Sequence, residues 1–167
     1  MNRWHIAQMN VGTLLYPLDD PRIAEFVSRL DEVNALADAS SGFVWRLQAA
    51  SGNATDIKTT DDPNFIVNMS VWASAEALFD FVYKSSHRLL MAKRYEWFIR
   101  PSGAYMVLWW AAAGTIPTVY EGLARLAHLE AHGPSAHAFT FKVRFPPPGD
   151  AGAPADLQPD PYCVGWR

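Results

Sequence analysis

The chain has 167 residues, half of them hydrophobic and 19% charged, a composition that predicts one folded domain and excludes a disordered protein. The net charge of −3, with no cluster of Lys and Arg, gives no electrostatic reason to expect nucleic acid as a partner. No apolar stretch reaches the roughly 20 residues that a bilayer requires, and no signal-peptide pattern opens the chain. Because Cys163 is the single cysteine, an internal disulfide is excluded. We expect a cytoplasmic protein without membrane partners.

The predicted elements follow one another without a long break. In chain order they are a strand over 4–11, a helix that begins after Asp20, strands over 43–48 and 64–72, a helix from Ser74 to about Phe98, a strand over 104–113, a helix from Thr118 to Gly133, and a strand over 138–145. Capping residues support the helix starts. Asp20 is followed by Pro21 at the first helical position, and Thr118 forms a capping box with Glu121.

This order of elements, βαββαβ with an added αβ unit, predicts a ferredoxin-like α+β domain with an antiparallel sheet and helices on one face. The third strand alternates between an apolar face and a mixed face, formed by Phe65, Val67, Met69 and Val71 and by Ile66, Asn68, Ser70 and Trp72. Both faces of the sheet are therefore expected to be buried, and a second copy of the sheet is the simplest cover for the face without helices. We expect a homodimer of a domain over residues 1–146, with a Pro- and Gly-rich C-terminal arm over residues 147–167.

The predicted second helix carries an unusual mixture of side chains on one face. Within FVYKSSHRLLMAKRYEWF, residues 81–98, steps of three and four residues align a phenol, an imidazole, a guanidinium and an indole: Tyr83, His87, Leu90, Arg94 and Trp97. A solvated face is rich in Lys and Glu, and a core face is rich in Leu, Ile and Val. The mixture therefore indicates either a half-buried face at a domain edge or the wall of a pocket.

Several polar residues stand where periodicity expects apolar ones. Asn34 lies on the apolar stripe of the first helix, Arg46 lies inside the second strand, and Asn68 and Ser70 lie inside the third. A buried amide or guanidinium needs hydrogen-bond partners, which other protein groups, water or a ligand can supply. Together with the aromatic residues, this set favours a ligand pocket between sheet and helices.

Two adjacent indoles in the fourth strand must point to opposite sides of the sheet, because side chains alternate along a strand. They belong to Trp109 and Trp110. One ring is expected to face the pocket on the helix side and the other to face the dimer barrel. The sequence does not show which ring is which.

Several strings of the sequence resemble a known bacterial family: NVGTLLYPLDDPRIAEFV, GFVWRLQ, NMSVW, FVYKSSHRLLMAKRYEWF, LWWAAAG and GPSAHAFTF. The family is called domain of unknown function 3291, and it stands near the antibiotic-biosynthesis-monooxygenase-like proteins of the dimeric α+β barrel superfamily. The resemblance covers residues 4–146 and implies the dimeric α+β barrel fold. It implies no settled reaction and transfers no catalytic residues.

The leading hypothesis is a small-molecule enzyme of the monooxygenase-like kind, which oxidises an apolar or aromatic compound of secondary metabolism without a cofactor. In such relatives, the substrate reacts with oxygen once a proton is removed and the carbanion is stabilised. We expect His87, Arg94 and Tyr83 in catalysis, with His87 as proton acceptor. The residues expected to bind the substrate are Trp72, Asn68, Arg46, Trp97, Asn34, Trp109 and Trp110. The same pocket suits a cyclase, an isomerase or a dehydratase.

Two further hypotheses involve no such reaction. Heme-degrading monooxygenases of the same superfamily carry their proximal histidine on the equivalent helix after a run like Val71-Trp72, so His87 is a candidate axial ligand of heme. A ligand-binding or structural dimer is the non-catalytic alternative. His128 and His132 are one helical turn apart, but both lie near an exposed helix end, and we expect no metal site.

Overall fold

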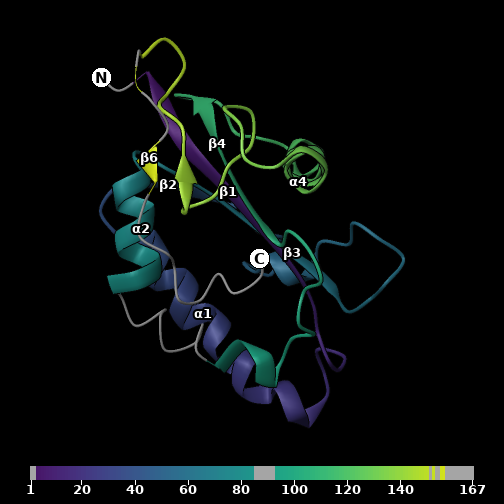
Figure 1. Cartoon of the computed structure of the whole chain (residues 1–167). Coiled ribbons are helices and arrows are strands. Elements are labelled where there is room, and N and C mark those ends of the chain that lie inside the picture. Colours follow the sequence, from purple (N-terminus) through teal and green to yellow (C-terminus); the bar gives the residue numbers. More distant parts are fainter. Residues whose placement is uncertain (1–2, 85–92, 151, 153–154, 157–167) are drawn as a thin grey trace.

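The computed structural model describes residues 3–84, 93–150, 152 and 155–156. Four strands form one antiparallel sheet in the order β2-β3-β1-β4 (Figure 1). Its strands are β1 (Trp4–Thr13), β2 (Phe43–Arg46), β3 (Phe65–Trp72) and β4 (Met106–Ala112). The longer helices are α1 (Ala24–Asp38), α2 (Ala75–Lys84) and α4 (Val119–His132), and the short ones are η1 (Pro21–Ile23), η2 (Ala54–Asp56) and η3 (Arg94–Glu96). This order of elements and strands confirms the ferredoxin-like α+β prediction. Among the described helices, none is both long and apolar enough to span a membrane.

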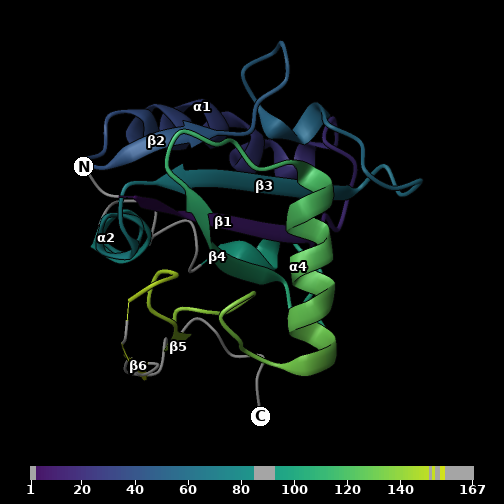
Figure 2. The ribbon, with the colours of Figure 1, turned by 90° about the horizontal axis from the view of Figure 1, so that it is seen from above.

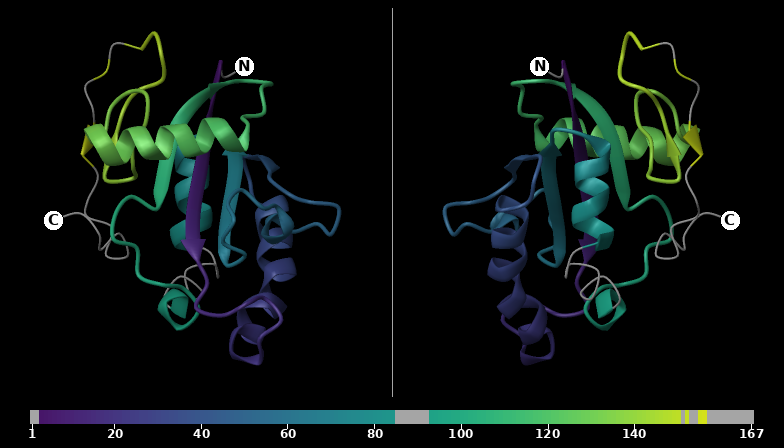
Figure 3. Two further views of the ribbon diagram at one scale, coloured as in Figure 1. Left: turned by 90° about the vertical axis from the view of Figure 1, so that its right-hand side faces the viewer. Right: turned by 90° about the vertical axis from the view of Figure 1, so that its left-hand side faces the viewer.

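The strand register decides which side chains share a face of the sheet. Ile6 of β1 lies opposite Trp72 of β3 and Trp110 of β4. Residues in step with these three form the face that α1 and α2 cover, which we call the helix-side face. Residues one position out of step form the opposite face, which α4 crosses and which we call the α4-side face. Figure 3 shows α4 over one face of the sheet and α2 over the other.

One half of the helix-side face is closely packed. The α2 residue Leu78 and the rings of Phe139 and Phe141 lie against Ile6 and Trp72, and all five side chains are buried. Each fully buried side chain of this size contributes about 1.5–3 kcal/mol to folding. This cluster is therefore a main anchor of the fold.

The α4-side face is covered by the chain's own helix. Leu126 and Leu129 of α4 pack on Met9 and Trp109, in a cluster that spans β1, β3 and β4. Gly122 makes the close approach possible, because a Cβ atom there would lie 2.4 Å from Cε of Met9. Figure 2 shows α4 running across the direction of the strands. The face that we expected a second copy to bury is thus occupied in part within one chain, and the homodimer stays a prediction.

The helix starts follow the capping signals in the sequence. The Asp20 carboxylate accepts hydrogen bonds from the guanidinium and the backbone N–H of Arg22, and these bonds lower the pKa of Asp20 to about 2. The Ala77 N–H donates to Ser74 Oγ at 3.1 Å, and the Glu121 N–H donates to Thr118 Oγ1 at 3.1 Å. The Glu121 side chain pairs with Arg125 instead of completing a capping box.

The prediction of a helix as far as Phe98 is wrong at its end. The Leu15 N–H donates to the Trp97 carbonyl at 2.8 Å, and the Ile99 N–H donates to the Thr13 carbonyl at 2.9 Å. Trp97 lies in the turn that follows η3, and Phe98 and Ile99 then lie beside the end of β1, where Phe98 forms an antiparallel bridge with Leu14. A helix would leave those edge groups of β1 without partners, and edge pairing therefore overrides helical periodicity.

The predicted strand over 138–145 is mostly wrong as well. Phe139 exchanges two backbone hydrogen bonds with Leu108 of β4, at 2.8 and 2.9 Å, and the chain then turns between Thr140 and Val143. Only β5 (Val143–Arg144) is a strand in this segment, and it pairs with β6 (Ala155–Asp156) outside the main sheet. The turn breaks the register that an added edge strand requires.

Candidate functional site

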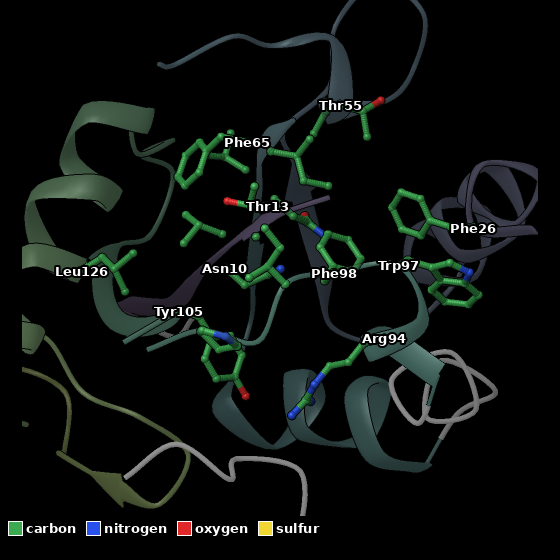
Figure 4. A pocket seen from close by; sticks show the side chains of 18 of the residues that line it. Asn10, Thr13, Phe26, Thr55, Phe65, Arg94, Trp97, Phe98, Tyr105 and Leu126 are labelled. Atoms are coloured by element: carbon green, nitrogen blue, oxygen red, sulfur yellow. The ribbon is translucent and has the colours of Figure 1, made fainter. Parts of the chain in front are cut away.

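A cavity of about 700 Å³ lies at the end of the sheet where β1 ends and β3 begins (Figure 4). Its size suits a drug-sized molecule. Figure 4 shows Asn10 near its centre, Phe26 and Trp97 on the side of α1, and Leu126 on the side of α4. Residues 94–105, which comprise η3 and the segment between η3 and β4, also line the cavity, with the exception of Glu96.

Two asparagines lie side by side on the helix-side face of the sheet, where that face borders the cavity. Asn10 of β1 is directly opposite Asn68 of β3, and both residues line the cavity. The Asn68 side chain is exposed although it lies within a central strand, and it makes no hydrogen bond within the described part of the chain. Its amide is therefore available to a ligand.

A chain of hydrogen bonds along the helix-side face fixes the direction of the Asn10 amide. Trp72 Nε1 donates to Ser70 Oγ at 2.9 Å, Ser70 Oγ donates to Gln8 Oε1 at 3.0 Å, and Gln8 Nε2 donates to Asn10 Oδ1 at 2.7 Å. An indole N–H can only donate, so the order of donors and acceptors cannot be reversed. Among the described residues, the Asn10 NH₂ group has no further partner, so it ends this series of hydrogen bonds and offers donors to the cavity.

A wall of aromatic rings and guanidinium groups borders the asparagine pair. Arg94 Nη2 donates to the Tyr95 hydroxyl at 2.8 Å, and the Arg94 guanidinium lies 4.6 Å from the Tyr95 ring centroid and 5.6 Å from that of Tyr105. On the side of α1, the Phe26 ring contacts those of Trp97 and Phe98 at 5.7 and 5.2 Å. The cavity thus combines apolar walls with a few convergent donors, as ligand sites usually do.

Four of the residues predicted for the site line this cavity: Arg94, Trp97, Asn34 and Asn68. Asn34 Nδ2 also donates to Asn53 Oδ1 at 2.6 Å, and Asn53 Nδ2 donates to Asp31 at 3.2 Å. The Asn34 amide therefore holds the loop before η2 against α1 while it borders the cavity.

Five other predicted residues lie away from the cavity: Tyr83, Trp72, Arg46, Trp109 and Trp110. The Tyr83 ring packs on Phe79 and Phe141, at 4.6 and 5.5 Å, so Tyr83 and Arg94 do not share one wall. Trp72 is fully buried and reaches the site only through its hydrogen-bond chain.

Arg46 and the two adjacent tryptophans have structural partners. The Arg46 guanidinium bonds the Asp38 carboxylate at 2.9 and 3.2 Å and the Gly52 carbonyl at 2.6 Å. Trp110 lies on the helix-side face and donates from Nε1 to the Phe145 carbonyl at 2.8 Å, whereas Trp109 lies beneath α4. The two indoles do point to opposite faces, as alternation requires.

His87, the predicted proton acceptor and alternative heme ligand, lies outside the described residues. Of the remaining histidines, the rings of His132 and His137 lie 4.6 and 4.8 Å from that of His128. Within the described part of the chain, no group of His, Cys, Asp and Glu is arranged to hold a metal ion.

Gln8 and Asn10 are among the residues of the site that sequence reasoning missed. The signal was present, because both lie on one face of the first predicted strand, two residues apart, like Asn68 and Ser70 in the third. What the sequence did not give was the register that sets Asn10 opposite Asn68 and Gln8 opposite Ser70.

Comparisons with known proteins give a family and distant structural neighbours. SnoaB from Streptomyces nogalater, a cofactor-independent oxygenase, has 18% identity and a TM-score of 0.47, and the match covers 68% of this chain and 98% of SnoaB. Rv0793 from Mycobacterium tuberculosis has 17% identity and a TM-score of 0.42, with 68% and 99% covered. NE2512 from Nitrosomonas europaea, a protein of unknown function, has 15% identity and a TM-score of 0.43, with 71% and 99% covered.

No curated protein matches the sequence. The family described as Domain of unknown function (DUF3291) matches residues 5–154, nearly the whole length of the described chain. The chain therefore belongs to the DUF3291 family.

Proposed function

We propose that the protein is a small-molecule oxygenase of the monooxygenase-like kind, which oxidises an apolar or aromatic metabolite in the 700 Å³ cavity. One observation carries the proposal. Two carboxamides, Asn10 and Asn68, lie next to each other at a cavity wall, and the direction of the Asn10 amide is fixed from the buried Trp72.

Such a pair of donors suits a reaction in which negative charge develops on a substrate oxygen. Loss of a proton from an acidic CH₂ beside a carbonyl gives an enolate, and N–H groups aimed at its oxygen stabilise it. The electron-rich enolate then reacts with O₂, and the net change converts CH₂ and O₂ into C=O and H₂O. The substrate itself supplies the electrons, so this route requires no cofactor.

The cavity walls support this chemistry. Phe26, Trp97 and Phe98 present rings on the side of α1, and rings displace water from around the charge. Donors act more strongly on a developing charge where water is excluded. Arg94 adds a positive charge at the same wall. His87 as the proton acceptor stays a prediction.

Anthrone provides a suitable probe, because its CH₂ group lies between two rings beside a carbonyl. We expect the protein to consume O₂ with anthrone and to form anthraquinone in equal amounts. Asn68→Ala removes one donor and is expected to lower the rate by about 10²–10³-fold. The melting temperature should stay unchanged, because the Asn68 amide has no partner to lose within the described chain.

Asn64→Ala provides the matched control, because Asn64 precedes β3 and does not line the cavity. Its rate is expected to equal that of the unmodified protein. Asn68→Ala with a full rate would refute the role of the asparagine pair. Conversion of anthrone to a product of unchanged mass, without O₂ consumption, would indicate an isomerase instead. A Soret band on addition of hemin that disappears in His87→Ala would indicate the heme alternative.

A further inference from the structure

The cavity reaches both faces of the sheet. Its lining includes Asn68, on the helix-side face, and its neighbours Val67 and Phe65, on the α4-side face. Adjacent residues of a strand point in opposite directions, so one cavity that touches both sets extends past the end of the sheet. Figure 4 shows this arrangement, with Leu126 and Trp97 on opposite sides of the strands.

An interruption in the pairing of β1 lies within this cavity. The Val11 N–H donates to the Tyr105 carbonyl at 2.8 Å, and the next bond along that edge runs from the Ile99 N–H to the Thr13 carbonyl. Between these bonds, residues 100–104 leave the edge of β1, and all of them line the cavity. The edge is therefore open beside Gly12.

Gly12 also brings an aromatic ring close to this opening. A Cβ atom at Gly12 would lie 2.8 Å from Cδ1 of Phe98, so only glycine lets that ring lie against the strand. The Phe98 ring, which also lines the cavity, thus lies on the helix side of this opening.

The two parts of the cavity differ in chemistry. On the α4 side the lining is almost wholly hydrocarbon: Leu47, Val67, Leu123, Leu126 and Ala127. Glu130 is the one carboxylate in the lining of the described cavity, and it lies at that side, where it accepts a hydrogen bond from the Ala104 N–H. The helix-side part holds the asparagine pair.

Positive charge gathers at the helix-side part. The Arg94 guanidinium lies over the Tyr95 ring, and the Arg100 guanidinium lies 4.1 Å from the same ring centroid. Within the described residues, no carboxylate lies within 4 Å of Arg100. Guanidinium groups held by stacking on aromatic rings are well placed to bind a planar carboxylate or enolate.

We propose that the substrate is an amphiphilic anion, whose charged ring system binds beside Arg94, Arg100 and the asparagine pair and whose hydrocarbon extension passes Gly12 into the α4-side part. This substrate class rests on the proposed function for its reaction. The test of the substrate class measures binding alone, so the substrate class and the proposed reaction can fail separately.

Three matched ligands test the proposal by isothermal titration calorimetry: 4-hexylbenzoate, benzoate, which lacks the alkyl chain, and 4-hexylbenzyl alcohol, which lacks the charge. We expect 4-hexylbenzoate to bind at least about tenfold more tightly than either of the others, because it alone combines the charge with the alkyl chain. Equal affinity of the acid and the alcohol, or of the two acids, would overturn the proposal. So would the absence of binding for all three ligands.

Two alanines of α4 provide a matched pair of variants. Ala127 and Ala124 are both exposed, but only Ala127 lines the cavity. Ala127→Phe is expected to reduce the affinity for 4-hexylbenzoate to that for benzoate, with benzoate binding unchanged. Ala124→Phe should bind all three ligands as the unmodified protein does. The same loss in both variants would contradict an α4-side chamber.

The charge is tested with Arg94→Gln and Arg100→Gln. Each is expected to weaken both acids by about fivefold or more and to leave the alcohol unaffected. Arg3→Gln serves as the control, because Arg3 is exposed and lies outside the cavity lining. If both cavity variants keep the preference for acid over alcohol, the anionic part of the proposal is wrong. If the binding pattern holds while anthrone consumes no O₂, the reaction is wrong and the substrate class stands.

Discussion

The two halves of the helix-side face differ although the same strands build both. At one end Ile6, Trp72 and Leu108 are fully buried beneath α2 and the segment around Phe139. At the other end the helices do not pack directly on the sheet, and Asn10 and Asn68 face a cavity. We call these the packed half and the hollow half.

The hydrogen-bond chain from Trp72 to Asn10 joins the two halves. Packing fixes the indole, the indole fixes the order of donors, and the last amide offers its N–H groups to the cavity. The packed half thus orients the Asn10 amide in the hollow half, although only the last residue of the series faces the cavity. A site built in this way resists the loss of donor geometry that a mobile amide would suffer.

The largest expected effect comes from breaking the packed half. Trp72→Ala leaves a large void among Phe43, Phe81 and Ile6 and is expected to lower the free energy of unfolding by about 3–5 kcal/mol. Urea denaturation followed by circular dichroism measures this change. A loss below about 1 kcal/mol would show that the indole contributes little to the packing of this half.

Trp72→Phe separates the two roles of the indole. It keeps most of the ring and removes the N–H, so the order of donors from Ser70 to Asn10 is no longer fixed. We expect the stability to fall by about 1–3 kcal/mol and the anthrone rate to fall by about tenfold. Trp110→Phe is the matched control. It also removes an indole N–H, but that N–H donates to the Phe145 carbonyl and takes no part in the hydrogen-bond series that ends at Asn10. Equal loss of rate in both variants would contradict a role for the chain.

The contrast between the halves also shows what the sequence could predict. Alternation and capping predicted the four main strands and three helix starts, because these depend on local side-chain patterns. Asn34 and Asn68, which the sequence singles out because polar groups inside apolar patterns need partners, line the cavity. These predictions required no knowledge of the register.

The remaining features depend on contacts between segments far apart in the chain. Residues 97–99 give up helical periodicity to pair with the end of β1, and Arg46 finds its partners in Asp38 and the Gly52 carbonyl. The Asn10–Asn68 pair exists only through the β1–β3 register. A local pattern cannot contain this information, because several registers satisfy the same alternation.

A loss of stability of intermediate size is expected at Arg46. This residue takes no part in the hydrogen bonds from Trp72 to Asn10, so its replacement should affect stability and not binding. Arg46→Met keeps the aliphatic stem and removes the bonds to Asp38 and to the Gly52 carbonyl. The side chain is 14% exposed and its carboxylate partner 46%, so solvent weakens the pair. We expect a loss of about 1–2 kcal/mol in urea denaturation and unchanged binding of 4-hexylbenzoate. A loss of ligand affinity in the folded variant would instead support the prediction from the sequence that Arg46 binds the substrate.

The smallest expected effect comes from His137, which follows α4 and belongs to neither half. Desolvation, the Arg125 charge and His128 lower the pKa of His137 from its ordinary value of 6.5, while Glu121 opposes the shift. The unfolded chain therefore binds this proton at a higher pH than the folded protein does. Below about pH 6.5 the free energy of unfolding should fall as the pH falls, until His137 is also protonated in the folded state.

His137→Gln tests this origin of the pH dependence. Urea midpoints between about pH 5 and 8 should fall less steeply toward acid in the variant than in the unmodified protein, with no difference between them above about pH 7. The anthrone rate should keep its own pH dependence in the variant, because His137 does not line the cavity. A variant whose stability profile follows that of the unmodified protein would assign the acid sensitivity to other groups. A changed rate profile would link the end of α4 to the hollow half, against the separation of the two regions seen in the structure.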